Sequence, residues 1–250
     1  MQRFFLSDTA KNKNEIIITD KNIINQISYV LRSKKGDKII CLFDDGKEHI
    51  VKLISFSKKE ILGQILEERK NDNEINFELV LYQALPKSKD KWEFIIAKAT
   101  ELGVTKIIPM ITSRTSAKYP VNSERIQKII RESAEQSERG ILPKISDVID
   151  IRNLDKNLHF SSINSDTNLF VCDSFNKNSK NLLKIIEEEK TQKKSYGIII
   201  GPEGGFSENE IKFLNNNNIN SVNLGKRTLR VETATILSLG SFMLAKNCER

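Results

Sequence analysis

Between Glu15 and Leu66 the hydrophobic residues form short runs of the β type, separated by turns. The runs begin near Ile16, Lys38, Glu48 and Ile61, and the turns include Lys35-Gly36-Asp37, Asp44-Asp45-Gly46 and Ser57-Lys58-Lys59. Only the stretch from about Ile24 to Arg32 has helical spacing. The pattern predicts a small β-rich unit with one short helix. The polar segment from Glu67 to Asn76 is then expected to be a linker.

Beyond this segment the period changes, because strand-like apolar runs now alternate with helical segments. The runs end at Leu85, Ile111, Cys172, Ile200 and Leu224. Alternation of this kind predicts a mostly parallel sheet with helices packed against it. The fold class is therefore predicted as α/β, with a smaller β-rich unit at the N-terminus.

Four helices are predicted in this second part. The first covers Asp90 to Leu102 and ends at Gly103, and the second runs from Glu124 to about Arg139. The third starts at Ser207, which has the spacing of a capping box with Glu210. The fourth, from about Glu232 to Lys246, is apolar nearly all round. Such a helix is expected to be buried, either in the core or against another subunit.

The composition narrows the class of protein without identifying a partner. The 250 residues are 38% hydrophobic and carry a formal net charge of +7. The charge favours polyanionic partners, although a solvated basic surface explains it equally well. Cys41, Cys172 and Cys248 are far apart and form no CxxC pair, which indicates neither a disulfide framework nor a zinc site. The first residues form too short an apolar run for a signal peptide, so we expect a cytoplasmic protein.

Ligands of open parallel sheets bind beyond the carboxyl ends of the strands, so the loops after the apolar runs are the candidate site. The runs lead into four unusual loops: Gly201 to Phe206, Gly225 to Ala234, Thr112 to Thr115, and Asp173-Ser174. Three glycines in the first of these allow backbone groups to approach a ligand closely. This loop lacks the Lys-Ser/Thr pair of a P-loop and the GxGxxG of a dinucleotide fold, which disfavours phosphate binding.

The first two of these loops also have a purely structural explanation. The glycine-rich segment alone is compatible with a tight strand-to-helix turn, and Glu232 or Thr233 with a helix cap. The only histidines are His49 and His159, and neither belongs to a Ser-His-Asp set or a cluster with metal-ligand spacing. These candidate residues fit a chemistry that needs neither a metal nor a nucleophilic side chain.

Taken together, these segments resemble the RsmE family, SPOUT-class methyltransferases that modify N3 of a uridine in the decoding region of 16S ribosomal RNA. The resemblance rests on segments in matching order along most of the chain: Arg3-Phe4-Phe5, Val30-Leu31-Arg32, Lys91 to Glu93, Lys98 to Val104, Pro109, Arg114, Ser133 to Ser137, Arg139, Gly201 to Phe206, Leu224-Gly225, and Leu229 to Ala234. One departure is visible, because the histidine that the family often has before the Val-Leu-Arg triplet is absent from Asn25 to Tyr29.

The resemblance implies an RNA-binding PUA-like β-barrel over residues 1–70 and a SPOUT methyltransferase domain over residues 74–250. The second domain is expected to form a trefoil knot, to bind S-adenosyl-L-methionine in it, and to pair with a second copy as a homodimer. The implied cofactor contacts are Ile200, Gly201, Glu203, Gly204, Leu224, Gly225, Leu229 and Val231, with Cys172 and Asp173, from the preceding strand end, as weaker candidates.

Methylation of a ring nitrogen requires positioning of the base and removal of a proton. We hypothesise that Arg114 and Arg230 stabilise charge on the uridine oxygens and that Glu232, or else Glu203, accepts the proton. Contacts with RNA phosphates are predicted for basic residues of the barrel, with a solvated surface as the alternative. These residues are Arg3, Arg32, Lys34, Lys35 and Lys38.

Three other functions remain open at this point. A SPOUT enzyme with another RNA target would have the same fold and cofactor. A non-catalytic RNA-binding assembly factor is disfavoured by the intact glycine-rich loop, because a decayed site would tolerate side chains there. A nucleotide-dependent enzyme of the doubly wound class is disfavoured by the missing phosphate-binding motifs.

Overall fold

The computed structural model describes residues 1–117, 119–154, 167–173, 179–189, 195–217 and 219–246. These residues form two compact units. The N-terminal unit comprises Met1–Glu74 and Ala134–Leu142, and the C-terminal unit comprises Ile75–Ser133 and Pro143–Arg250. The division into domains 1–70 and 74–250 stays a prediction, to which the structure adds that residues 134–142 return to the N-terminal unit.

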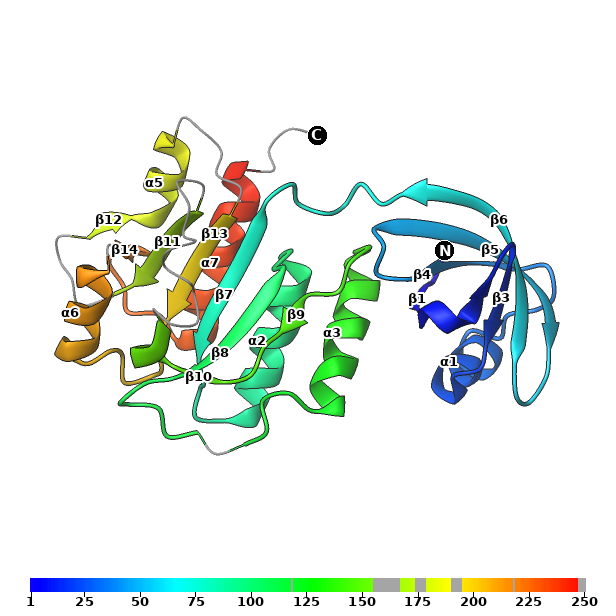
Figure 1. Cartoon of the computed structure of the whole chain (residues 1–250), viewed down its shortest axis with the longest axis horizontal. Helices are drawn as coiled ribbons and strands as arrows, with labels where there is room; N and C mark the ends of the chain where they lie inside the picture. The colour runs from blue at the N-terminus through cyan, green and yellow to red at the C-terminus, as the bar shows by residue number, and fades with distance from the viewer. Residues whose placement is uncertain (118, 155–166, 174–178, 190–194, 218, 247–250) are drawn as a thin grey trace. The chain divides into compact units, whose positions relative to one another are not determined.

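The N-terminal unit is built on a curled six-stranded sheet (Figure 1) with the strand order β1-β4-β5-β6-β3-β2. Its strands are β1 (Arg3–Phe5), β2 (Lys11–Asn12), β3 (Glu15–Ile18), β4 (Lys38–Leu42), β5 (Lys47–Phe56) and β6 (Ile61–Lys70). A short 3-10 helix covers Asp8–Ala10, and α1 (Lys21–Asn25) continues into a π-helix over Gln26–Val30. Alternate residues such as Ile16, Ile18, Val51 and Leu53 point into one apolar core.

The predicted linker from Glu67 to Asn76 is wrong in its first part. Strand β6 runs on to Lys70 and pairs with β5 in antiparallel register, Lys47 opposite Lys70. The side chains of this strand end are exposed, so the sequence carries no hydrophobic alternation there. Sheet pairing, not burial, makes these residues a strand.

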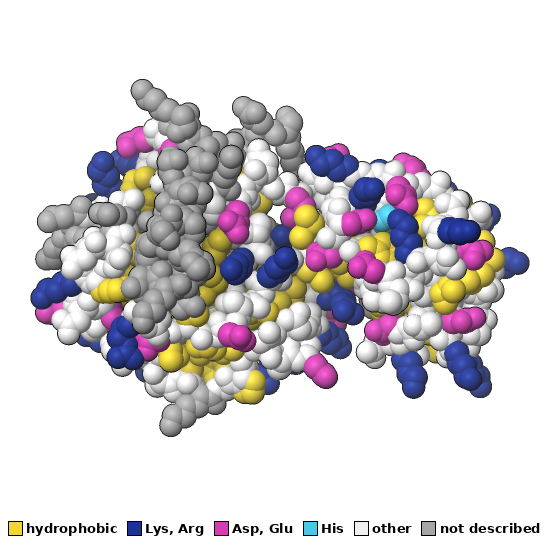
Figure 2. All heavy atoms as spheres, viewed as in Figure 1, with side chains coloured by type: hydrophobic (Ala, Val, Ile, Leu, Met, Phe, Trp, Pro, Cys, Tyr) yellow, Lys and Arg dark blue, Asp and Glu magenta, His cyan; other side chains and the backbone are white. Residues whose placement is uncertain are grey.

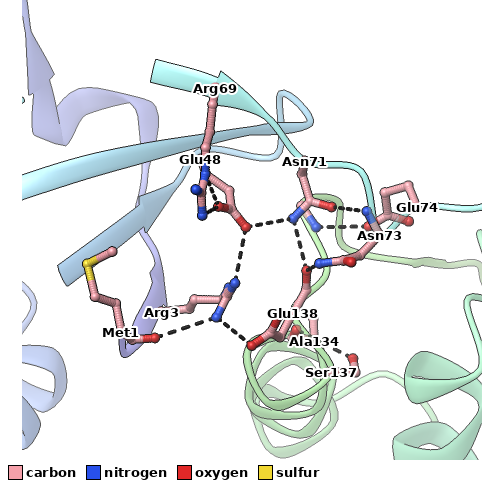
Figure 3. A network of polar contacts seen from close by, with 11 residues as sticks. Met1, Arg3, Glu48, Arg69, Asn71, Asn73, Glu74, Ala134, Ser137 and Glu138 are labelled. Atoms are coloured by element: carbon pink, nitrogen blue, oxygen red, sulfur yellow. Dashed lines mark hydrogen bonds and ion pairs between the residues drawn. The ribbon is translucent and has the colours of Figure 1, made fainter. Parts of the chain in front are cut away.

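Figure 3 shows a network of polar contacts in this unit around the buried carboxylate of Glu48, which we call the Glu48 cluster (Arg3, Glu48, Arg69, Asn71 and Glu138). Glu48 is 3% exposed and accepts four hydrogen bonds from three side chains. Arg69 donates two of these bonds, at 2.8 and 2.6 Å, Asn71 donates one at 3.2 Å and Arg3 donates one at 3.3 Å. Arg3 also donates to Glu138 at 2.8 Å. The cluster thereby fastens residue 138, just after α3, to the strands of the N-terminal unit.

The C-terminal unit contains a sheet in which every described pair of strands is parallel. Its strand order is β10-β8-β7-β13-β11-β14-β12, with β9 beside β8. The strands are β7 (Glu78–Ala84), β8 (Lys106–Ile111), β9 (Lys144–Ile145), β10 (Ile149–Asp150), β11 (Thr167–Cys172), β12 (Lys180–Asn181), β13 (Ser195–Ile200) and β14 (Asn220–Asn223). The predicted α/β class and parallel sheet are confirmed. The trefoil knot stays a prediction.

Helices pack on both faces of this sheet. They are α2 (Lys89–Glu101), α3 (Glu124–Gln136), α5 (Leu182–Glu188), α6 (Glu208–Asn216) and α7 (Val231–Lys246), with a 3-10 turn at Ile151–Asn153. One face packs Val80, Tyr82 and Ile199 against that turn and α6. On the other face α7 lies against α2, α5 and β13, and its Phe242 contacts Phe170. No helix among the described residues is long and apolar enough to cross a membrane.

The predicted helices agree with the structure to within a few residues. The capping box of α6 is confirmed, because Ser207 accepts from the Glu210 backbone and Glu210 from the Ser207 backbone. Helix α3 ends at Gln136 rather than Arg139, since Glu138 takes a left-handed φ of 62°. Helix α7 buries one face but leaves Leu237 45% and Leu244 63% exposed.

Candidate active site

A cavity of about 370 Å³ lies at the carboxyl ends of β13, β11 and β14, three neighbouring parallel strands. The loops that follow β13 and β14 form most of its wall. It is lined by all but one of the predicted cofactor contacts: Cys172, Asp173, Ile200, Gly201, Glu203, Leu224, Gly225, Leu229 and Val231. The exception, Gly204, lies in the same turn between two lining residues. The strand-end rule thus places the predicted residues around one cavity.

The glycine-rich loop after β13 is a tight turn that also shapes this cavity. The Gly205 N–H donates to the Pro202 carbonyl at 2.8 Å, and Gly205 has a φ of +67° that a side chain would strain. Phe206 folds back over Gly201, whose added Cβ would lie 3.0 Å from the ring. Both the turn and the cavity wall therefore depend on glycine.

The loop after β14 closes the opposite side of the cavity. Gly225 takes a φ of +110°, and its N–H donates to the side chain of Asn223 at 3.1 Å. Arg230 lines the cavity, and its carbonyl accepts the Ala234 N–H at 2.8 Å in the first turn of α7. The start of α7 thus holds Arg230 at the cavity wall.

Lys91, on the first turn of α2, pairs with two carboxylates, of which Glu203 lines the cavity and Glu232 does not. Its ammonium donates to Glu203 at 2.9 Å and lies 4.0 Å from Oε2 of Glu232, and Lys91 itself lines the cavity. Burial alone would raise the pKa of Glu203, but donation from Lys91 and from backbone N–H groups outweighs it and lowers the pKa. Among the described residues, Oε2 of Glu232 is a buried oxygen without a hydrogen-bond partner.

Arg114 reaches the outside of the glycine-rich turn. Its Nη1 donates to the carbonyl of Gly204 at 2.7 Å, and a Cβ on Gly204 would lie 3.4 Å from the Arg114 side chain. The loop that carries Arg114 is itself a turn, in which Thr115 donates to the Thr112 carbonyl at 3.1 Å. The structure thus brings Arg114, from the β8 loop, to the turn that walls the cavity.

The predicted RNA contacts fall into two groups. Arg32, Lys34, Lys35 and Lys38 are exposed, and Arg32 has a left-handed φ of 55°. Arg3 is not retained as an RNA contact, because its side chain is only 10% exposed and bonds to Glu48 and Glu138.

His159 and Cys248 lie outside the described residues, and the structure places His49 in strand β5.

Sequence reasoning gave Lys91 no role, although it lay within a segment that resembles the family. The signal that points to Lys91 is its place after a strand: it lies in the first turn of the helix that follows β7, at the same edge of the sheet as the other loops. The turn between β7 and α2 contains no glycine, so its sequence does not indicate a ligand-binding loop.

Known RNA methyltransferases are similar to this chain over most of its length. The RNA methyltransferase domain family matches residues 73–243, and the RNA methyltransferase PUA domain matches residues 30–66. Ribosomal RNA small subunit methyltransferase E of Bacillus subtilis is 31% identical over 96% of this chain and 95% of that protein. The chain belongs to the RsmE family of RNA methyltransferases. The RsmE protein of Mesomycoplasma hyopneumoniae is 34% identical over 96% of this chain and 97% of its own.

A solved RsmE structure, from Neisseria gonorrhoeae and bound to S-adenosyl methionine, has the same fold. It superposes with a TM-score of 0.83 at 27% identity and covers 98% of this chain and 97% of that one. The cavity described above fits such a molecule in size, since small-molecule sites have volumes of about 300–1,000 Å³. Ile200, Leu229 and Val231 offer apolar walls for a flat base, and the nearby carboxylates of Asp173 and Glu203 suit a sulfonium cation.

We expect Gly201→Ala to weaken S-adenosylmethionine binding about tenfold. The new Cβ would lie 3.0 Å from the Phe206 ring, which also lines the cavity, so the ring must shift. Strain from overpacking of about 1.4 kcal/mol corresponds to a factor of ten in affinity. Isothermal titration calorimetry measures the change. Lys52→Ala, at an exposed position of β5 that does not line the cavity, is the control, and equal affinities for the two variants would contradict the prediction.

Proposed function

We propose that this protein is an S-adenosylmethionine-dependent methyltransferase that modifies N3 of a uridine in the decoding region of 16S ribosomal RNA, in the small ribosomal subunit. The observation that carries the proposal is the cavity at the ends of β13, β11 and β14, with Arg230 and Lys91 in its wall. Homologues named ribosomal RNA small subunit methyltransferase E, at 31% and 34% identity, support the choice of substrate.

The residues around the cavity divide the work of methyl transfer. S-adenosylmethionine supplies the methyl group from its sulfonium sulfur. Arg114 and Arg230 stabilise the negative charge that develops on the uridine oxygens when N3 loses its proton. Holding the base in line with the methyl group requires the two loops that bear these arginines to be fixed.

Glu232 is the better candidate for the proton acceptor. Glu203 is held in its charged form by Lys91 and by the backbone N–H of Lys87, which is shared between both carboxylate oxygens. These donors lower the pKa of Glu203 and make it a weak base. Glu232 has only Lys91 near Oε2, at 4.0 Å, and that oxygen accepts no hydrogen bond within the described structure. That oxygen therefore keeps an unused lone pair for the uridine proton. Because it is buried and Glu232 does not line the cavity, proton transfer requires the side chains that cover it to move when RNA binds.

The test is transfer of radiolabelled methyl from S-adenosylmethionine to small ribosomal subunits of a strain that lacks the modification. The product is mapped by the reverse-transcription stop that an N3-methylated uridine causes. A single stop at a decoding-region uridine is the expected result. Transfer to a different RNA would make this a methyltransferase with another target, and cofactor binding without transfer to any RNA would favour an assembly factor.

We further propose that the exposed basic residues before and at the start of β4 bind RNA phosphates. Arg32, Lys34, Lys35 and Lys38 follow the exposed side chains of Tyr29 and Val30, which are 72% and 74% accessible. The described part of the face drawn in Figure 2 intersperses Lys and Arg with Asp and Glu, so net charge alone does not mark the RNA site. A basic segment beside an exposed aromatic side chain suits an unpaired stretch of RNA.

The double charge reversal Lys34→Glu and Lys35→Glu is expected to raise KM for small subunits about tenfold at low salt. Two lost phosphate contacts and two added repulsions weaken docking, and the deficit shrinks as salt screens it. Methyl transfer is measured at several salt concentrations. Lys58→Glu with Lys59→Glu, an equally exposed pair in the β5–β6 turn, is the matched control. A similar rise in KM for the control would show a general effect of charge.

A homodimer in the cytoplasm is also proposed. Helix α7 exposes Leu237 and Leu244 on the face opposite Leu239 and Phe242, which are fully buried. Leucines on the outer face of a helix that begins beside the cofactor cavity suit contact with a second copy. Sedimentation velocity tests the dimer.

A further inference from the structure

The carboxylate of Glu210 receives four hydrogen bonds from two separate loops. The backbone N–H and the hydroxyl of Ser113 donate to it at 2.7 and 3.1 Å. The backbone N–H and the hydroxyl of Ser207 donate to it at 2.7 and 3.0 Å. Glu210 is 6% exposed. Burial alone would raise its pKa, but these four donors outweigh burial and lower it, so the group is charged at neutral pH.

Helix capping explains only half of this arrangement. Ser207 and Glu210 form the capping box of α6, and that motif is complete without any other residue. Ser113 lies 97 positions earlier in the chain, in the loop after β8. Its two bonds to Glu210 are not needed to cap α6, so what they fix is the position of the β8 loop.

The β8 loop carries Arg114, the residue directly after Ser113. Arg114 donates to the Gly204 carbonyl at 2.7 Å, and Gly204 is three residues before Ser207. The Ser113–Glu210 bonds and the Arg114–Gly204 bond therefore join the same two loops at neighbouring points. With the loop fixed at Ser113, Arg114 loses the freedom to swing away from the glycine-rich turn.

We propose that Glu210 is a positioning residue for methyl transfer, which holds the β8 loop so that Arg114 faces the substrate at the edge of the cofactor cavity. The inference rests on the proposed function and on the role given there to Arg114. Glu210 itself does not line the cavity. Its loss therefore changes turnover through Arg114 and leaves cofactor affinity nearly unchanged.

Five variants, one of them the conservative Glu210→Gln, test the proposal in assays with small subunits at a temperature at which the variants compared are folded. Glu210→Ala removes both connections, and Ser207→Ala weakens the α6 cap while keeping the two Ser113 bonds. Arg114→Ala and the double variant Arg114→Ala/Glu210→Ala show whether the two residues act together. Melting temperature, Kd for S-adenosylmethionine, kcat and KM are measured for each.

We expect Glu210→Ala to lower kcat on the order of 30-fold, in the range caused by misplacement of a catalytic group by about an ångström. Ser207→Ala is expected to lower the melting temperature but to keep kcat within about threefold, since a lost N-cap costs stability alone. The double variant should be no slower than Arg114→Ala, because removal of Arg114 leaves Glu210 nothing to position. Glu210→Gln, which keeps one acceptor oxygen, should retain part of the activity.

Other results overturn the proposal in distinguishable ways. If Glu210→Ala and Ser207→Ala lose stability alike and keep kcat alike, Glu210 is only a helix cap. If the two losses multiply in the double variant, Glu210 does not act through Arg114. Should Glu210→Ala fail to fold, Glu210→Gln carries the same comparison. If the wild-type protein transfers no methyl group to any RNA, the proposed function itself fails, and this inference fails with it.

Discussion

Replacement of Glu48 by alanine is expected to destabilise the N-terminal unit by about 3–5 kcal/mol, the usual cost of breaking a buried ion pair by removing one partner. Glu48 is the common acceptor for Arg3, Arg69 and Asn71 (Figure 3). Without it the Arg3 guanidinium, only 10% exposed, keeps a single carboxylate partner, Glu138, which is itself 55% exposed. The Nε of Arg3 already lacks a hydrogen-bond partner, so the site has no spare acceptor.

Native-state hydrogen exchange measured on peptides from β4 to β6 isolates this loss from the C-terminal unit. The control is Asp72→Ala, just after β6, which removes a carboxylate whose side chain is 85% exposed and whose ion-pair partner Lys70 is equally exposed. An exposed pair of this kind contributes about 0–1 kcal/mol. If the two variants lose similar protection, the buried position of Glu48 does not decide its contribution.

The Glu48 cluster also shows what the sequence did not predict about the fold. Hydrophobic period and capping residues are local, and they located α2, α6 and α7 within a residue or two. The return of Ala134–Leu142 to the N-terminal unit depends on bonds between residues far apart in the chain. Asn71 to the Glu138 carbonyl and Leu142 to Asp44 are examples, at 2.9 and 2.6 Å. Nothing in the local pattern of either segment signals such a pairing.

The candidate site was more predictable, because parallel sheets place the ends of their strands at one edge. Knowing which runs were strands was enough to bring the β13 and β14 loops together with Cys172 and Asp173. The position of a strand does not reveal which ion-pair or hydrogen-bond partner a charged side chain will have. The sequence predicts a surface cation at Arg3, whose side chain is only 10% exposed in the structure. It predicts the capping role of Glu210 but carries no signal for the bonds that Ser113 donates to it.

Arg114→Ala and Arg230→Ala are each expected to lower kcat for small subunits about 100- to 1,000-fold, the range seen when one preorganised donor to a developing anion is removed. Both side chains approach the glycine-rich turn or the cavity wall from loops that follow parallel strands. A guanidinium there stabilises charge only when the uridine anion forms, so kcat falls more than KM changes.

Cofactor binding separates the two arginines. Arg230 lines the cavity and Arg114 does not, so Arg114→Ala should keep Kd for S-adenosylmethionine within about threefold, less than the tenfold that 1.4 kcal/mol represents. Arg125→Ala is the control, because that arginine is 61% exposed and its bond is to Glu93, away from the cavity. Single-turnover methyl transfer to small subunits measures the chemical step directly. Wild-type rates for both arginine variants would leave two untested cations in the cavity wall, Lys91 and Arg227. Of these, Lys91 would be tested first, since it pairs with both Glu203 and Glu232 in the described structure.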